Sequence, residues 1–130
     1  MPGSGSTIAI VQARMGSTRL PGKVLADLCG APLLQRQLER VRRATSLDRV
    51  VVATSTDETD LPIAELCESL DVPCFRGDLN DVLARFLGAI NEFNPEVVVR
   101  ITADCPLISP SVIDSIVHSF FELIQVAPRA

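Results

Sequence analysis

The segment from Gln12 to Lys23 concentrates residue types that bind phosphate groups. Its candidate residues combine cationic, small and hydroxylated side chains: Gln12, Ala13, Arg14, Gly16, Ser17, Thr18, Arg19, Gly22 and Lys23. Small residues let backbone N–H groups approach phosphate oxygens, hydroxyls add donors, and cations offset charge that is costly to desolvate. The segment therefore predicts a loop that binds a polyanion such as a nucleoside triphosphate. A basic loop that is merely solvated is the alternative.

This loop differs from two common phosphate-binding signatures. Five residues separate Gly16 from Gly22, where a Walker A loop has four, and Val24 stands where that loop has a Ser or Thr for magnesium. No GxGxxG run occurs, so the dinucleotide-binding fingerprint is also absent.

Asp104 is the candidate metal ligand. It follows a Val- and Ile-rich run, and a carboxylate at a strand end can hold a hydrated Mg²⁺ that also bridges phosphate oxygens. On the residues alone, Asp104 could equally cap the turn before Pro106. The segments Thr54–Asp57 and Arg76–Asp78 could enclose a base and ribose by hydrogen bonding, although turn capping explains them as well.

Four β-branched runs alternate with segments of helical period, which predicts four β-α units. The expected strands are 7–13, 49–54, 73–76 and 97–102, and the expected helices lie within 32–44, 61–70, 82–93 and from 110 onward. Asp60 is expected to cap the second helix. The nearly continuous Val and Ile of 97–102 indicates a strand buried on both faces. The last helix is expected to turn its apolar residues inward: Val112, Ile113, Ile116, Val117 and Phe120.

Repeated β-α units predict an α/β fold with a mostly parallel sheet, right-handed crossovers and helices on both faces. In such sheets, ligands bind outside the carboxyl ends of the strands. The residues expected at that edge are 14–23, 55–60, 77–81 and 103–106. Most of the candidate residues lie in these four loops.

Length and composition fit one domain with an ordinary core, because the chain has 130 residues of which 47% are hydrophobic. We expect a flexible leader at 1–6, a nucleotide-binding domain at 7–122 and a tail at 123–130. No apolar run approaches the roughly 20 residues of a membrane span, so a cytoplasmic protein without a membrane partner is expected. Cysteines 29, 67, 74 and 105 form no CxxC pair, which argues for reduced thiols and against zinc.

The charge distribution is asymmetric. Residues 1–50 carry eight Arg and Lys against three acids, whereas residues 51–130 carry four against thirteen. The net charge of −4 argues against a nucleic-acid partner, which normally requires an extended basic surface. The local positive charge near the N-terminus suits a small anionic ligand.

Four motifs occur in an order that resembles a known family: QARMGSTRLPGKVL, VVVATS, FRGDLNDVLARF and VVRITADCPLI. Together they resemble the cytidylyltransferase family that includes the spore coat polysaccharide biosynthesis protein SpsF and, more distantly, the CMP-Kdo and CMP-sialic acid synthetases. The resemblance runs from about Ile8 to about Phe121. It implies a Rossmann-like, GT-A-like nucleotidyltransferase fold, a three-layer sandwich that binds CTP and Mg²⁺. A sugar acceptor would attack the α-phosphorus, and pyrophosphate would leave.

The resemblance also assigns roles to individual residues. Arg14, Lys23 and Asp104 are the expected catalytic residues, with Asp104 as the Mg²⁺ ligand. Ala13 is expected to meet the base through its backbone. The full expected nucleotide-binding set is Gln12, Ala13, Arg14, Gly16, Ser17, Thr18, Arg19, Lys23, Ser55, Asp57, Arg76 and Asp81.

Members of this family continue beyond the fourth β-α unit, so the resemblance implies an incomplete C-terminal part. Three functional hypotheses follow. The chain is a cytidylyltransferase or its nucleotide-binding half, a non-catalytic nucleotide-binding module, or a nucleotidyltransferase that uses UTP, GTP or ATP. An exposed sheet edge left by the incomplete part would favour a homodimer.

Overall fold

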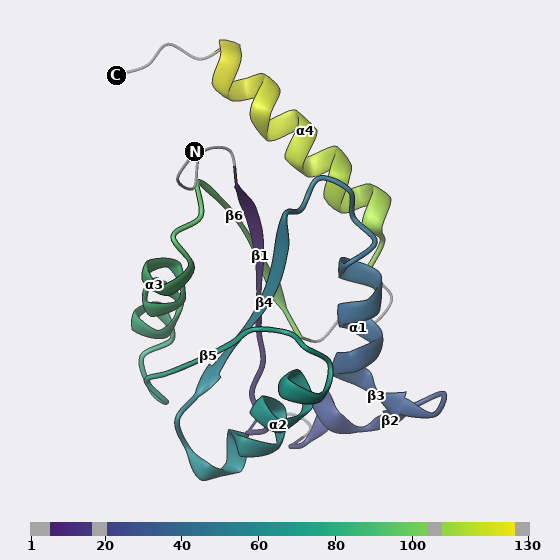
Figure 1. Cartoon of the computed structure of the whole chain (residues 1–130), viewed down its shortest axis with the longest axis vertical. Helices are drawn as coiled ribbons and strands as arrows, with labels where there is room; N and C mark the ends of the chain where they lie inside the picture. The colour runs from purple at the N-terminus through teal and green to yellow at the C-terminus, as the bar shows by residue number, and fades with distance from the viewer. Residues whose placement is uncertain (1–5, 17–20, 104–107, 127–130) are drawn as a thin grey trace.

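The computed structural model describes residues 6–16, 21–103 and 108–126 and contains a four-stranded parallel sheet in the order β5-β4-β1-β6 (Figure 1). The main elements are β1 (Thr7–Gln12), α1 (Leu33–Val41), β4 (Arg49–Ser55), α2 (Leu61–Ser69), β5 (Cys74–Gly77), α3 (Val82–Phe93), β6 (Val97–Thr102) and α4 (Pro110–Val126). An antiparallel pair, β2 (Asp27–Leu28) and β3 (Ala31–Pro32), precedes α1, and two 3-10 helices, η1 (Lys23–Leu25) and η2 (Glu58–Asp60), lie at the carboxyl edge. The predicted α/β class and the four β-α units are confirmed.

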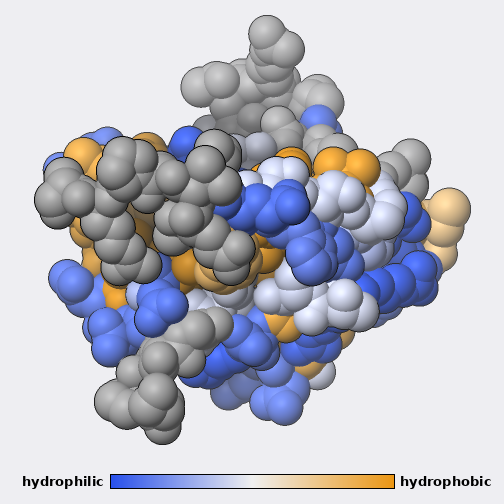
Figure 2. Space-filling view, turned by 90° about the horizontal axis from the view of Figure 1, so that it is seen from above, coloured by the Kyte–Doolittle hydropathy of each residue, from blue (hydrophilic) through white to orange (hydrophobic). Residues whose placement is uncertain are grey.

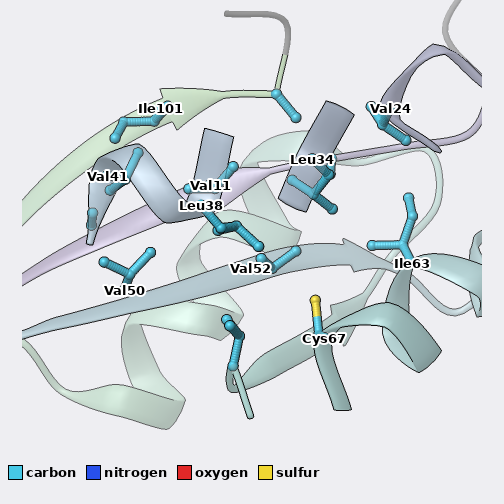
Figure 3. Packing of buried hydrophobic residues seen from close by; sticks show 14 of the residues in the cluster. Val11, Val24, Leu34, Leu38, Val41, Val50, Val52, Ile63, Cys67 and Ile101 are labelled. Carbon is cyan, nitrogen blue, oxygen red and sulfur yellow. The ribbon is translucent and has the colours of Figure 1, made fainter. Parts of the chain in front are cut away.

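Helices cover both faces of the sheet. The odd-numbered residues of β1, such as Val11, pack toward α1, α2 and α4, and the even-numbered ones, such as Ile10, pack toward α3. Figure 3 shows Leu34, Leu38 and Val41 of α1 gathered over the sheet around Val11. These three residues recur at helical spacing, which explains why the segment forms an amphipathic helix on this face.

The order in which strands are added to the sheet changes side at β1. β4 and β5 are added on one side of β1, whereas β6 pairs with β1 on its other side. The carboxyl ends of β1 and β6 therefore form a topological switch point, the place where open α/β sheets bind ligands.

Two predictions about burial are wrong. The predicted two-sided burial of β6 is wrong, because β6 is an edge strand of the sheet that the described residues form, and within β6 only Ile101 is buried. In α4, Ile113 and Val117 are buried as expected, whereas Val112, Ile116 and Phe120 are exposed. A run of apolar residues indicates a strand or an apolar helix face but does not show whether a neighbouring element covers it.

Apolar side chains consequently reach the surface. Viewed from above the orientation of Figure 1, hydrophobic patches interrupt the hydrophilic surface (Figure 2). Within residues 6–16, 21–103 and 108–126, no helix has both the length and the apolar character that a membrane span requires. Residues 1–5 of the predicted leader 1–6 and residues 127–130 of the predicted tail lie outside the described residues, while α4 extends through residues 123–126.

Candidate functional site

The loop that follows β1 is closed at its neck by a backbone hydrogen bond. The N–H of Gly22 donates to the carbonyl of Met15 at 2.7 Å, and Gly22 adopts a left-handed conformation with φ of 77° that favours glycine. Lys23 then begins η1, where the neighbouring Val24 is buried in the core. The backbone of Lys23 is therefore held at the base of the loop. Ser17, Thr18 and Arg19 lie outside the described residues.

Asp60 anchors this loop to the rest of the fold. Its fully buried carboxylate accepts hydrogen bonds from Arg14 Nε at 2.9 Å and from the Met15 N–H at 2.7 Å. The hydroxyl of Ser55 donates to the same carboxylate. The predicted capping role is wrong, because the Asp60 side chain makes no capping hydrogen bond to α2. Asp60 occupies the N-cap position of α2, but its side chain instead ties the loop after β1 to the end of β4.

A pocket of about 410 Å³ opens at the carboxyl ends of β1 and β6, beside the start of α3. The described residues that line it are Gln12, Ala13, Arg14, Gly16, Val24, Val82, Arg85, Arg100, Thr102 and Ala103. Three of these are arginines, and none of these lining residues is acidic. The structure thus brings the predicted residues Gln12, Ala13, Arg14 and Gly16 together at the switch point. Lys23 is not in this lining, although it immediately precedes Val24.

Arg85 is a residue of this pocket that the sequence analysis missed. It is only 3% exposed, and its Nη1 donates to the carbonyls of Asp78 at 2.7 Å and Leu79 at 3.3 Å. Nη1 of Arg14 also donates to the Leu79 carbonyl, at 3.4 Å. Burial lowers the pKa of Arg85, and the nearby positive charge of Arg14 lowers it further. Two guanidinium groups therefore converge at the pocket, with the carboxylate of Asp60 paired to only one of them.

Two buried donors at this pocket have no hydrogen-bond partner within the described part of the chain. They are Nε of Arg85 and Nε2 of Gln12. Buried polar groups in folded proteins normally have partners, and exceptions often mark a binding site. A signal for Arg85 was present in the sequence, because an arginine stands among the apolar positions of the predicted helix, between Val82 and Phe86.

Gly16 leaves space for the Arg14 side chain. A Cβ atom at residue 16 would lie 3.0 Å from Nη2 of Arg14, closer than ordinary van der Waals contact. At Ala13, the N–H donates to the carbonyl of Ala53 at 3.0 Å. The backbone contact predicted between Ala13 and a base would therefore use the Ala13 carbonyl.

The predicted residues after β4 make hydrogen bonds within their own loop. Ser55 is buried, and its hydroxyl oxygen accepts from the N–H of Asp57 at 3.1 Å. Asp57 caps η2, where hydrogen bonds from the hydroxyl and then the N–H of Thr59 lower the pKa of the Asp57 carboxyl. Neither residue lines the pocket at the switch point. Their role in nucleoside binding stays a prediction.

Arg76 and Asp81 have similar structural partners. Arg76 donates from Nε and Nη2 to the carbonyls of Ser55 and Asp57, both at 2.9 Å. Asp81 caps α3 by accepting from the N–H of Ala84 at 2.9 Å. The Arg76 bonds join β5 to the end of β4 and the loop after it, and the Asp81 bond fixes the start of α3, the helix that carries Arg85. Direct contact of either residue with a nucleotide also stays a prediction.

The described residues do not supply a metal centre. No cluster of three or more His, Cys, Asp or Glu side chains that could hold a metal occurs within residues 6–16, 21–103 and 108–126. The predicted ligand Asp104 lies outside these ranges, as does Cys105, but it directly follows Ala103, which lines the pocket.

Comparison with known proteins identifies the family. A family model described as cytidylyltransferase matches residues 8–126. The spore coat polysaccharide biosynthesis protein SpsF of Bacillus subtilis is 40% identical over 117 residues, which cover 87% of this chain and 49% of that protein. The uncharacterized protein MJ1063 of Methanocaldococcus jannaschii is 47% identical over 107 residues, covering 82% and 44% respectively.

A solved cytidylyltransferase from Leptospira borgpetersenii has a TM-score of 0.86 and 37% identity, covering 90% of this chain and 49% of that one. The chain thus spans about half the length of the relatives it matches. The match over residues 8–126 shows that this chain belongs to the cytidylyltransferase family.

Proposed function

We propose that the pocket between β1 and β6 binds CTP together with Mg²⁺. In this proposal, the chain is the nucleotide-binding part of an enzyme that transfers CMP to a sugar acceptor and releases pyrophosphate, in polysaccharide biosynthesis. The observation that carries the proposal is the convergence of Arg14 and Arg85 on one carbonyl beside a pocket with no acidic side chain among its described lining residues. Membership of the cytidylyltransferase family is the reason for proposing CTP as the nucleotide.

The charge balance favours a phosphate chain as the ligand of this pocket. The buried carboxylate of Asp60 forms a salt bridge with Arg14, whereas within the described residues Arg85 forms no salt bridge with a carboxylate. Hydrogen bonds between guanidinium groups and phosphate oxygens are strong because both groups are charged and the geometry is bidentate. The proposed triphosphate would satisfy the buried Arg85 and bring negative charge to the Arg14 loop. Ser17, Arg19 and Lys23 are proposed as further phosphate contacts from the family motif.

The base is proposed to lie beside the end of β1. Cytosine carries an exocyclic amino group that donates hydrogen bonds. The carbonyl of Ala13 is a suitable acceptor, and the unpartnered Nε2 of Gln12 is a donor for a ring or carbonyl acceptor of the base. This pair of contacts would favour cytosine through hydrogen-bonding pattern rather than pocket size.

Mg²⁺ is proposed to bind through Asp104. When bound, the ion would neutralise part of the charge on the phosphate chain and polarise it. Arg14, Arg85 and Lys23 would hold the β- and γ-phosphates and leave the α-phosphorus open to the acceptor oxygen. Nucleotidyl transfer depends mainly on such alignment and charge stabilisation.

Titration calorimetry with CTP, UTP, GTP and ATP in the presence of Mg²⁺ tests the proposal. We expect CTP to bind most tightly, and Lys23→Ala to weaken it by about 1.5 to 3 kcal/mol, the range for hydrogen bonds to charged groups. Arg43→Ala is the matched control, since Arg43 is an exposed cation at the end of α1 and should leave affinity unchanged. No binding heat from CTP in well-folded protein would contradict the proposal.

A nucleotide-binding module without turnover is the second candidate function. Binding of CTP without pyrophosphate release, in an assay run beside a full-length relative, would support the module. Pyrophosphate release at a comparable rate would support the enzyme.

A further inference from the structure

Two cysteine side chains meet between α2 and β5. Cys67 lies on α2 and is fully buried in the core cluster that contains Val52 of β4. Cys74 begins β5, pairs in register with Val52, and packs against the same cluster. Figure 3 shows the sulfur of Cys67 pointing from α2 toward β4. The two thiols share a hydrogen bond, which Cys67 donates to the sulfur of Cys74.

The backbone between the two cysteines holds them in this position. The carbonyl of Cys67 accepts a hydrogen bond from the N–H of Val72 at 2.8 Å, which turns the chain back toward the sheet after α2. The next carbonyl along, that of Pro73, accepts from the N–H of Val52 at 2.9 Å. The turn and the strand pairing that bring the two thiols together thus lie within residues 52–74.

The two thiols differ in access and in reactivity. Cys74 is partly exposed and lines a pocket of about 390 Å³ beside α2, whereas Cys67 is fully buried and is not in that lining. The hydrogen bond from Cys67 lowers the pKa of Cys74, and the positive charge of Arg76 on the same strand lowers it further, although burial opposes both effects. The same hydrogen bond and burial raise the pKa of Cys67. Because the thiolate is the reactive form, Cys74 is the thiol that an oxidant attacks first.

We propose that Cys74 and Cys67 form a reversible oxidation site, at which a peroxide converts the two thiols into a disulfide that links β5 to α2. An accessible thiol beside a second, resolving thiol is the usual arrangement of redox-sensing cysteines. Disulfides of cytosolic proteins are usually transient ones of this kind. The proposal depends neither on the nucleotide nor on the proposed function.

The oxidation proceeds in two steps. The Cys74 thiolate attacks one oxygen of hydrogen peroxide and breaks the O–O bond, which gives a sulfenic acid at Cys74 and releases hydroxide that is protonated to water. The sulfur of Cys67 then attacks the Cys74 sulfur and breaks its S–O bond. The departing hydroxide takes the proton of the Cys67 thiol and leaves as a second water. The two thiols together lose two electrons, and the peroxide gains them.

Peptide mapping of the wild-type chain tests the proposal. No Lys or Arg occurs between Arg49 and Arg76, so the tryptic peptide 50–76 carries both cysteines of the pair and no other. After treatment with hydrogen peroxide, this peptide should resist alkylation and be about 2 Da lighter than its reduced form, because disulfide formation removes two hydrogen atoms. Further cleavage before Asp71 should give fragments that stay joined until dithiothreitol separates them.

Two variants separate the roles of the thiols. In Cys67→Ala, the sulfenic acid at Cys74 has no resolving thiol, so its labelling by dimedone should rise by about 10-fold or more over the wild type. Cys29→Ser is the matched control, because it removes an exposed thiol outside the pair and should leave the disulfide in peptide 50–76 unchanged. An unchanged peptide 50–76 under conditions that oxidise Cys29 would overturn the proposal. Oxidation of Cys74 to a sulfinic acid while Cys67 stays free would overturn it as well.

Thermal unfolding tests whether the disulfide fits the native fold. A cross-link that the fold accommodates restricts the unfolded chain, so oxidation should raise the Tm by about 5 to 10 °C, and dithiothreitol should reverse the rise. Cys67→Ala cannot form the cross-link, and peroxide should leave its Tm unchanged. A lower Tm in the oxidised wild type would mean that the disulfide distorts the packing of α2 on β5, which would refute a built oxidation site.

Discussion

Replacement of Asp60 by Asn should destabilise the fold and also loosen the loop that follows β1. One carboxylate oxygen accepts from the N–H of Met15 at 2.7 Å, and the other accepts from Arg14 Nε at 2.9 Å and from the Ser55 hydroxyl. Asn keeps the shape but replaces one oxygen with an NH₂ group. Whichever way the amide is oriented, one of the two N–H donors then faces another donor.

The magnitude follows from burial. Breaking a buried ion pair costs about 3 to 5 kcal/mol. The Arg14 side chain is 31% exposed, so water compensates part of its loss. We expect the free energy of unfolding to fall by about 2 to 3 kcal/mol in Asp60→Asn, which combines the damped ion pair with an unsatisfied buried donor.

Urea denaturation followed by circular dichroism measures this loss, and calorimetry with CTP and Mg²⁺ measures the effect on the loop. Asp57→Asn is the matched control for the urea measurement alone, because the same chemical change at this carboxylate removes only local bonds to Thr59. Asp57→Asn should lower the free energy of unfolding much less than Asp60→Asn does. If Asp60→Asn unfolds at the wild-type urea concentration and binds CTP with wild-type affinity, the assignment of Asp60 as the anchor is refuted.

Two further predictions concern packing and pH. In Gly88→Ala, the new Cβ would lie 2.5 Å from Cζ of Phe75. Overpacking costs about 1 to 3 kcal/mol and outweighs the gain of about 1 kcal/mol in helix propensity. Urea denaturation should therefore show that the free energy of unfolding falls by about 1 kcal/mol. The Ser46 hydroxyl and N–H lower the pKa of Asp114 to about 2. This is below its unfolded value of about 3.9, so its stabilising effect is complete above about pH 4 and is lost as pH falls toward 2. The stability difference between the wild type and Asp114→Ala should shrink over that range.

The elements of the fold could be predicted from the sequence because each has a local signature. The buried run before Ala13 and the helical spacing of Leu34, Leu38 and Val41 define β1 and α1 without reference to any other part of the chain. The predictions of burial were wrong where the burial of an element depends on whether another element packs against it. The Val and Ile of β6 and the apolar residues of α4 have the composition of core elements, but the sequence does not show that β6 lies at the edge of the sheet that the described residues form.

The candidate site shows the same division. Rules for parallel sheets put Arg14 and Gly16 at the carboxyl edge, where both line the pocket, because those rules concern strand ends. Gln12 and Ala13 also line it, but they were expected there from the family motif. Arg85 was missed because its position beside Arg14 depends on the tertiary packing of α3.

The arrangement around the Leu79 carbonyl also explains why binding should contribute to stability. A buried guanidinium loses hydration, and two guanidinium groups near one carbonyl repel each other, so the pocket concentrates cationic charge at a cost to the free protein. The carboxylate of Asp60 and the carbonyls of Asp78 and Leu79 offset only part of that cost. The proposed triphosphate would offset the rest, and it would stabilise the folded state more as its affinity rises. In the proposed function, the repulsion between the two guanidinium groups that lowers the stability of the free protein would therefore also favour binding of a phosphate chain.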